Sequence, residues 1–214
     1  MRRLAVPLAI LLLLAIPGTA RAAAPVELYG GDPYHVSTQG VRCAFGLAVA
    51  GGFVAAPCGQ VGAATYTVDG VQTGTIVSVA SRYEGNIAYI RTTSGFVPRP
   101  YVRSGTALLP VRGATEAAIG ARVCRYGTST GTRCGFVTGR NLTLNFADGF
   151  RITGVTRASV CNEAGDRIGP FLAGDQAQGL LLATSGNCTA GGVSYYLPIG
   201  PQLTRLGFTL LTAP

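Results

Sequence analysis

Short runs in which apolar and polar residues alternate, separated by turn-forming residues, make up most of this chain. The runs are rich in Val, Ile, Thr, Phe and Tyr, and several end in dipeptides such as Asp69-Gly70 and Asp148-Gly149, which favour tight turns between antiparallel strands. The pattern therefore predicts an all-β sandwich or barrel. Strands are expected at 43–50, 52–56, 64–68, 73–79, 86–91, 122–125, 132–138, 142–146 and 150–155.

One short helix is predicted near the carboxyl end. Pro201 suits the first turn of a helix, where its missing N–H leaves no hydrogen bond unmade. Leu203 and Leu206 would then turn toward the core. No repeat, low-complexity tract or linker divides the chain, so we expect a single domain after the amino-terminal segment.

The first 22 residues have the order of a secretory signal peptide. Arg2 and Arg3 precede an apolar run over residues 4–16, and a small-residue stretch ends at Ala22, where we expect cleavage. The mature domain would then cover residues 23–214. The apolar run is shorter than the roughly 18 residues that span a bilayer, so we expect no membrane insertion and a secreted product, extracellular or in the cell envelope.

Charge and composition narrow the classes of partner. The chain has 17 arginines, no lysine, 9 acidic residues and a net charge of +8, and loss of residues 1–22 would leave +5. The arginines are scattered singly and no aromatic residues interleave them, which argues against nucleic-acid binding. The chain has a single histidine and no C-x-x-C pair, so we expect no metal and no cofactor. We also expect a monomer.

Six cysteines in an exported chain predict disulfide bonds, but spacing alone does not choose among the possible pairings.

Four blocks of sequence occur together and in order. They are 29–46 (YGGDPYHVSTQGVRCAFG), 123–149 (VCRYGTSTGTRCGFVTGRNLTLNFADG), 157–180 (RASVCNEAGDRIGPFLAGDQAQGL) and 185–199 (SGNCTAGGVSYYLPI). In this order they resemble the alpha-lytic protease and streptogrisin branch of the chymotrypsin-like serine peptidases, over about residues 29–207. The resemblance implies the trypsin-like fold: two Greek-key, six-stranded β-barrels, at about 29–110 and 114–207, with the family's active site in the crevice between them.

The same resemblance implies a disulfide pattern and a buried ion pair. The implied disulfides join Cys43 to Cys58, Cys124 to Cys134, and Cys161 to Cys188. The ion pair joins Arg125 to Asp166, and we interpret it as structural, because breaking a buried pair leaves one charge without a partner.

The catalytic positions that the resemblance implies are all substituted. Pro57 stands directly before Cys58, where the family has its histidine, in a segment one residue shorter. Asn86 stands where a carboxylate is expected, and it has no negative charge with which to stabilise an imidazolium. In the segment GDRIGP, Arg167 occupies the nucleophile's position and Ile168 that of the following glycine.

The residues expected to form the substrate groove are also substituted relative to the family. Leu182, Ala183 and Thr184 stand where the family has Ser-Gly-Gly, so side chains replace hydrogens along the edge that a peptide would approach. His35, the single histidine, is expected to be an exposed strand residue rather than a relocated base. Without lysine, a Ser-Lys dyad is excluded.

The sequence therefore indicates a secreted, catalytically inactive homologue of these endopeptidases that acts by binding. The vestigial oxyanion loop offers Gly165 and Arg167, whose backbone N–H groups and guanidinium could hold an anion. Alternatively, Arg167 points to solvent or fills the crevice. Two other functions stay open: an active serine endopeptidase with a rearranged site, and an extracellular scaffold or decoy for peptidases or their inhibitors. The ligand is an unknown protein, peptide or anion.

Overall fold

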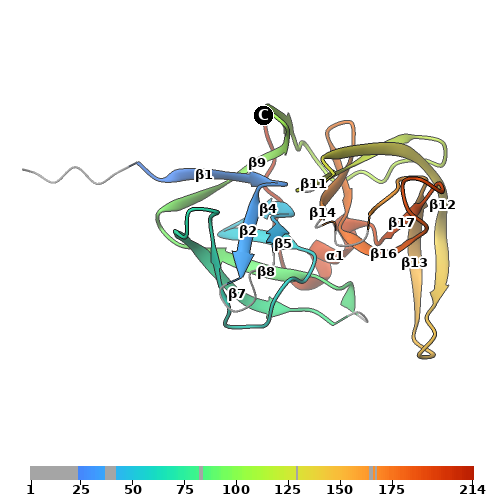
Figure 1. The fold of residues 1–214 in the computed structure, drawn as a ribbon, viewed down its shortest axis with the longest axis horizontal. Coiled ribbons are helices and arrows are strands. Elements are labelled where there is room, and N and C mark those ends of the chain that lie inside the picture. The colour runs from blue at the N-terminus through green and yellow to red at the C-terminus, as the bar shows by residue number, and fades with distance from the viewer. Residues whose placement is uncertain (1–23, 37–41, 82–83, 129, 164–165, 167) are drawn as a thin grey trace, which may run out of the picture.

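The computed structural model describes residues 24–36, 42–81, 84–128, 130–163, 166 and 168–214. Two β-barrels lie side by side, with the first in blue to green and the second in yellow to red (Figure 1). A short helix, α1, follows the second barrel near the carboxyl end. The predicted all-β fold with one short C-terminal helix is thus confirmed.

The first barrel is an antiparallel sheet of seven segments in the order β3-β2-β6-β7-β8-β5-β4. Its two edge segments, β3 and β4, are separated only by Phe45 and Gly46, so they form one bent strand that closes the sheet and leaves six strands in the barrel. At Gly46 a Cβ would lie 2.1 Å from the Val54 carbonyl oxygen, so only glycine fits the bend. The segments are β2 (Pro33–Val36), β3 (Arg42–Ala44), β4 (Leu47–Val49), β5 (Gly52–Ala55), β6 (Ala64–Tyr66), β7 (Gln72–Val79) and β8 (Ala88–Thr92).

The second barrel closes in the same way. Its order is β15-β14-β11-β12-β13-β17-β16, and the edge segments β15 and β16 are separated only by Leu180, which is buried. Hydrophobic side chains of both barrels meet in one core cluster, where Leu47 and Val54 of the first lie with Leu172 of the second. The segments are β11 (Arg122–Gly127), β12 (Thr132–Asn145), β13 (Arg151–Ala158), β14 (Ile168–Ala173), β15 (Gln176–Gly179), β16 (Leu181–Ser185) and β17 (Val193–Tyr196).

A third, three-stranded sheet has the order β1-β9-β10 and adjoins the first barrel. It consists of β1 (Val26–Gly30), β9 (Phe96–Ser104) and β10 (Ala107–Pro110), and β1 pairs with β9 in parallel. Helix α1 (Ile199–Leu206) has Pro201 in its first turn and buries Leu203, as predicted. It ends at Gly207, whose φ of 73° is readily adopted by glycine.

Two strands predicted separately, 132–138 and 142–146, form the single long strand β12. Its pairing with β13 shifts register between Gly139 and Leu142, and Asn141 has a φ of 52°. The turn-like residues thus mark an irregularity within a strand rather than a break between strands. No helix in the described part of the chain is long and apolar enough to cross a membrane.

Each of the three disulfides joins two cysteines of the same barrel. They join Cys43 to Cys58, Cys124 to Cys134, and Cys161 to Cys188, which are the pairs that the sequence resemblance implies. None of the six cysteines is free.

Candidate functional site

A cavity of about 200 Å³ lies at the junction of the two barrels. The first barrel contributes residues of β3 and of the segments beside β5 and β8, and the second contributes Asp166 and the start of β16. Most of the lining is apolar or uncharged. The described lining residues are Cys43, Ala44, Ala56, Pro57, Cys58, Asn86, Asp166, Leu181 and Leu182.

Strand pairing brings Pro57 and Asn86 together. In the antiparallel pair of β5 and β8, Ala55 lies opposite Ala88. Pro57 follows Ala55 by two residues and Asn86 precedes Ala88 by two, so the chain places them across from each other beyond the ends of the paired strands. Both side chains line the cavity and both are partly buried.

Asn86 is held in the left-handed region, with a φ of 54°, a conformation that asparagine tolerates better than most residues. Its backbone N–H donates to the Ser81 carbonyl at 3.0 Å. The same turn is capped by Glu84, whose carboxylate accepts from the Ser81 N–H and hydroxyl, and these bonds lower the pKa of Glu84. Asn86 therefore has a fixed backbone at the cavity, and its side chain is a neutral amide.

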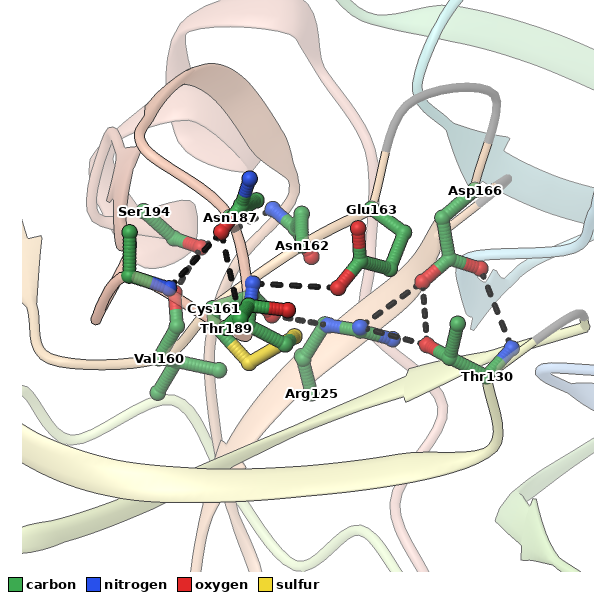
Figure 2. Close-up of a disulfide and its surroundings, with 12 residues drawn as sticks. Arg125, Thr130, Val160, Cys161, Asn162, Glu163, Asp166, Asn187, Thr189 and Ser194 are labelled. Atoms are coloured by element: carbon green, nitrogen blue, oxygen red, sulfur yellow. Dashed lines mark hydrogen bonds and ion pairs between the residues drawn. A yellow bond between two sulfur atoms is a disulfide. The ribbon is translucent and has the colours of Figure 1, made fainter.

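Asp166 is one half of a fully buried ion pair (Figure 2). Its carboxylate lies 2.7 Å from Arg125 Nη2, and the two side chains are 1% and 0% exposed. The Thr130 hydroxyl donates to Asp166 and accepts from Arg125. Arg125 also donates to the carbonyls of Cys161 at 3.0 Å and Gly131 at 3.2 Å.

These contacts leave Asp166 without the character of a free base. Both carboxylate oxygens accept hydrogen bonds from Thr130, and one of them also faces the guanidinium. Burial lowers the pKa of Arg125, and the charge of Asp166 opposes that effect. The pair thus neutralises itself inside the protein, and Arg125 connects Asp166 to β11 and to the carbonyl of Cys161.

The two residues after Cys161 also make hydrogen bonds beside the last disulfide. Glu163 accepts a hydrogen bond from the backbone N–H of Cys188 at 3.0 Å, and Cys188 is bonded to Cys161 (Figure 2). Asn162, beside the disulfide, donates to the Ser194 hydroxyl at 3.0 Å. Asn162 and Glu163 are therefore both held to the segment 188–194.

The predicted groove residues separate into two groups. Leu182 lines the cavity, whereas Ala183 and Thr184, on the same strand β16, are outside its described lining and pair with Tyr195 and Ser194 of β17. His35 lies partly exposed on β2 and is also outside the lining. Gly165 and Arg167 lie outside the described residues, so the predicted anion site at the vestigial oxyanion loop has no structural description.

Chemically, the described lining can bind but offers little for catalysis. Its single ionisable side chain outside a disulfide is Asp166, which is already paired. The apolar side chains could receive a small apolar group, and the Asn86 amide could exchange hydrogen bonds with a neutral one. Among the described residues, no cluster of His, Cys, Asp and Glu has the geometry to hold a metal ion.

Sequence reasoning missed several contributors to this site. Leu181, Ala44 and Ala56 line the cavity, and Thr130 completes the ion pair. None of these carries a chemistry-bearing group in a recognisable spacing. Thr130 could have been sought, because a buried arginine and carboxylate need further hydrogen-bond partners and the polar run 128–132 follows the strand that carries Arg125.

Several curated proteins are similar to this chain, although no protein-family model matches it. It is 39% identical over 194 residues to Streptogrisin-C of Streptomyces griseus, a match that covers 87% of this chain and 42% of the relative. For Streptogrisin-A of the same organism the identity is 33%, with 85% and 60% covered. The chain thus spans about half the length of these two. Serine protease 2 of Streptomyces fradiae is 31% identical, with 77% and 99% covered.

Solved structures give the same result. The chymotrypsin of Cellulomonas bogoriensis is 35% identical to this chain with a TM-score of 0.75, and the match covers 87% of this chain and all of that one. A structure described as alpha-lytic protease homolog N4 is 30% identical with a TM-score of 0.71, at the same coverage.

Proposed function

Because the chain belongs to the chymotrypsin-like serine peptidases, in the streptogrisin and alpha-lytic protease branch, we propose that it is an inactive member that acts by binding. We assign residues 1–22 to a signal peptide and 23–214 to the mature domain, with its barrels at about 29–110 and 114–207. The protein would thus be secreted, in the extracellular space or the cell envelope.

The observation that carries this proposal is the lining of the cavity between the barrels. We assign Pro57 to the position of the general base, Asn86 to that of its orienting carboxylate, and Arg167 to that of the nucleophile. A serine nucleophile needs a base within hydrogen-bond reach. The described lining offers a pyrrolidine ring, a neutral amide and the ion-paired Asp166 in its place.

The expected loss of activity is large. Removing a complete triad from a comparable hydrolase costs about 10⁶-fold in turnover. A residual rate would depend on the oxyanion hole and on substrate binding, and in this chain Leu182 intrudes on the cavity. We therefore expect no peptidase activity that could serve a biological purpose.

Binding in the cavity is favoured over an empty, purely structural crevice by its composition. Ala44, Ala56, Pro57, Leu181 and Leu182 provide an apolar lining, and Asn86 adds an uncharged hydrogen-bonding group. A volume of about 200 Å³ is below the ~300 Å³ at which pockets for whole small molecules begin. The occupant that fits is one apolar side chain of a neutral peptide segment.

The experiment that tests the proposal compares the wild type with a revertant. The revertant carries Pro57→His, Asn86→Asp, Arg167→Ser, Ile168→Gly and Thr184→Gly. Both proteins, with their disulfides formed, are assayed on a panel of chromogenic peptides. A matched control keeps Pro57 and carries the other four substitutions, so that it has a serine without a base.

The proposal predicts a silent wild type and cleavage by the revertant alone. Hydrolysis by the wild type that a serine-directed inhibitor stops would show an active peptidase with a rearranged site instead. Capture of peptidase inhibitors by the silent wild type would give its binding role the form of a decoy.

A further inference from the structure

A second hollow, which we call the tyrosine groove, lies on the three-stranded sheet beside the end marked C in Figure 1. Its volume is about 370 Å³, and none of its lining residues belongs to the cavity between the barrels. Along β9, Arg99, Tyr101 and Arg103 alternate with Val102, which is buried, so these three face away from the core. The groove is lined by Glu27, Tyr29, Arg99, Pro100, Tyr101, Leu108 and Pro214.

A charged network holds one aromatic ring of the groove, that of Tyr29, in place. The Tyr29 hydroxyl donates to one carboxylate oxygen of Glu27, and Arg99 donates to the other from Nε at 2.8 Å. The Arg103 guanidinium lies 4.7 Å from the centre of the Tyr29 ring and is itself paired with Asp32. Hydrogen bonds from Tyr29 and from Arg99 lower the pKa of Glu27. A binding partner would therefore meet a Tyr29 ring that is already ordered, which reduces the entropy cost of association.

The shape of the groove suits a flat, rigid, apolar ring. Tyr29 and Tyr101 meet edge to face, with centroids 6.5 Å apart and planes at 75°, so the two rings form a corner rather than a flat platform. Pro100 and Pro214 add rigid apolar surface, and Leu108 is 39% exposed at the rim. Rigid aromatic anchors of this kind give contact area at a low conformational cost.

The free polar groups of the groove are mainly donors. Among the described residues the Tyr101 hydroxyl makes no hydrogen bond, and Arg99 has a terminal nitrogen, Nη1, beyond the two that face Glu27. Among the side chains that line the groove, the one carboxylate is that of Glu27, and both of its oxygens already accept hydrogen bonds. A ligand that matches this surface brings acceptors and few donors, and no net charge, since the Glu27–Arg99 pair is neutral.

We propose that the tyrosine groove binds a proline-rich peptide segment in the polyproline II conformation. Proline has no N–H, and in this conformation every backbone carbonyl is free to accept a hydrogen bond. Aromatic-lined grooves recognise such segments because their backbone is ordered before binding. The ring of a ligand proline would sit in the corner between Tyr29 and Tyr101, and its neighbouring carbonyls would accept from the Tyr101 hydroxyl and from Arg99.

The test titrates the wild-type protein against a fluorescein-labelled oligoproline peptide and follows fluorescence anisotropy. Tyr101→Ala is expected to weaken binding by about tenfold or more. Tyr101→Phe keeps the ring and removes the donor, so a loss of about threefold to tenfold is expected. Arg99→Gln, at a half-exposed position, provides a second variant if Tyr101→Ala fails to fold.

Two controls isolate the groove. Phe136→Ala removes an aromatic ring that is 55% exposed on β12, in the second barrel, and is expected to leave affinity unchanged. A Gly-Ser peptide of equal length is expected not to bind. Because the groove shares no residue with the cavity between the barrels, this result does not depend on whether the protein cleaves peptides.

Several results would overturn the proposal. One is the absence of saturable oligoproline binding to the folded wild type. Another is equal affinity of the wild type and both Tyr101→Ala and Arg99→Gln. A third is binding of a neutral oligosaccharide, lost in Tyr101→Ala, by a protein that ignores oligoproline, which would assign the groove to carbohydrate.

Discussion

Replacement of Asp166 by asparagine removes one charge from the buried pair while keeping the size of the side chain. Arg125, whose side chain is 0% exposed, would then hold a positive charge without a counter-ion. Breaking a buried pair in this way costs about 3–5 kcal/mol of folding free energy. The carbonyls of Cys161 and Gly131 and the Thr130 hydroxyl still accept from Arg125, so we expect about 3 kcal/mol, the lower end of that range.

The loss is measurable by urea unfolding and by thermal unfolding, each followed by circular dichroism with the disulfides intact. A domain of this size loses roughly 2–4 °C in melting temperature per kcal/mol, so Asp166→Asn should melt about 6–12 °C below the wild type. Asp175→Asn is the matched control, because its ion pair with Arg112 is exposed on both sides (38% and 52%), and such pairs contribute little.

Replacing both partners separates the charge from the packing. The double variant Arg125→Met with Asp166→Leu leaves no buried charge, so it should be more stable than Asp166→Asn. If Asp166→Asn proves no less stable than Asp175→Asn, the buried pair does not contribute to the stability of the fold, contrary to this prediction.

Three further predictions concern single residues. Tyr196→Phe removes a buried hydroxyl that has no partner among the described residues, so it should stabilise the fold by about 1 kcal/mol in the same urea assay. Burial raises the pKa of Tyr126 and of Tyr196, and the folded state therefore binds these protons more tightly than the unfolded state. The stability linked to the protonated forms of these two tyrosines should be fully present below pH ~10 and should be lost as the pH rises above it. The loss should be smaller in Tyr196→Phe. Urea midpoints measured at neutral and at alkaline pH would show both effects. Asn86→Gly should preserve stability, whereas Asn86→Ala should lower it by about 1 kcal/mol because of the φ of 54°; equal midpoints for the two would contradict a left-handed Asn86.

Local patterns predicted much of the fold. Alternation of apolar and polar residues located most strands, and Pro201 with Leu203 located the helix. The bends that close each barrel were not visible, because a bend at Gly46 or Leu180 depends on what packs against it rather than on its own sequence. Gly139 and Asn141 read as a turn between strands, yet the partner strand β13 carries the pairing through them.

The sequence likewise predicted some residues of the candidate site and not others. Pro57 and Asn86 could be singled out because the resemblance gave their positions a chemical expectation, and the pairing of β5 with β8 explains why they meet. Leu181 and Ala44 carried no such expectation. The tyrosine groove was missed altogether, because it depends on the parallel pairing of β1 with β9, and such long-range contacts leave no local signature.

The most direct test of lost catalysis is the intact mass of the folded, disulfide-bonded protein after incubation with a fluorophosphonate probe that labels activated serines. The wild type is expected to keep an unchanged mass under conditions in which an active serine peptidase is fully labelled, whereas the revertant described above gains one adduct per molecule. The opposite result would be a single, stoichiometric adduct on the folded wild type that does not form when the protein is heat-unfolded before incubation with the probe. It would show that this chain has a reactive serine outside the positions assigned to the triad.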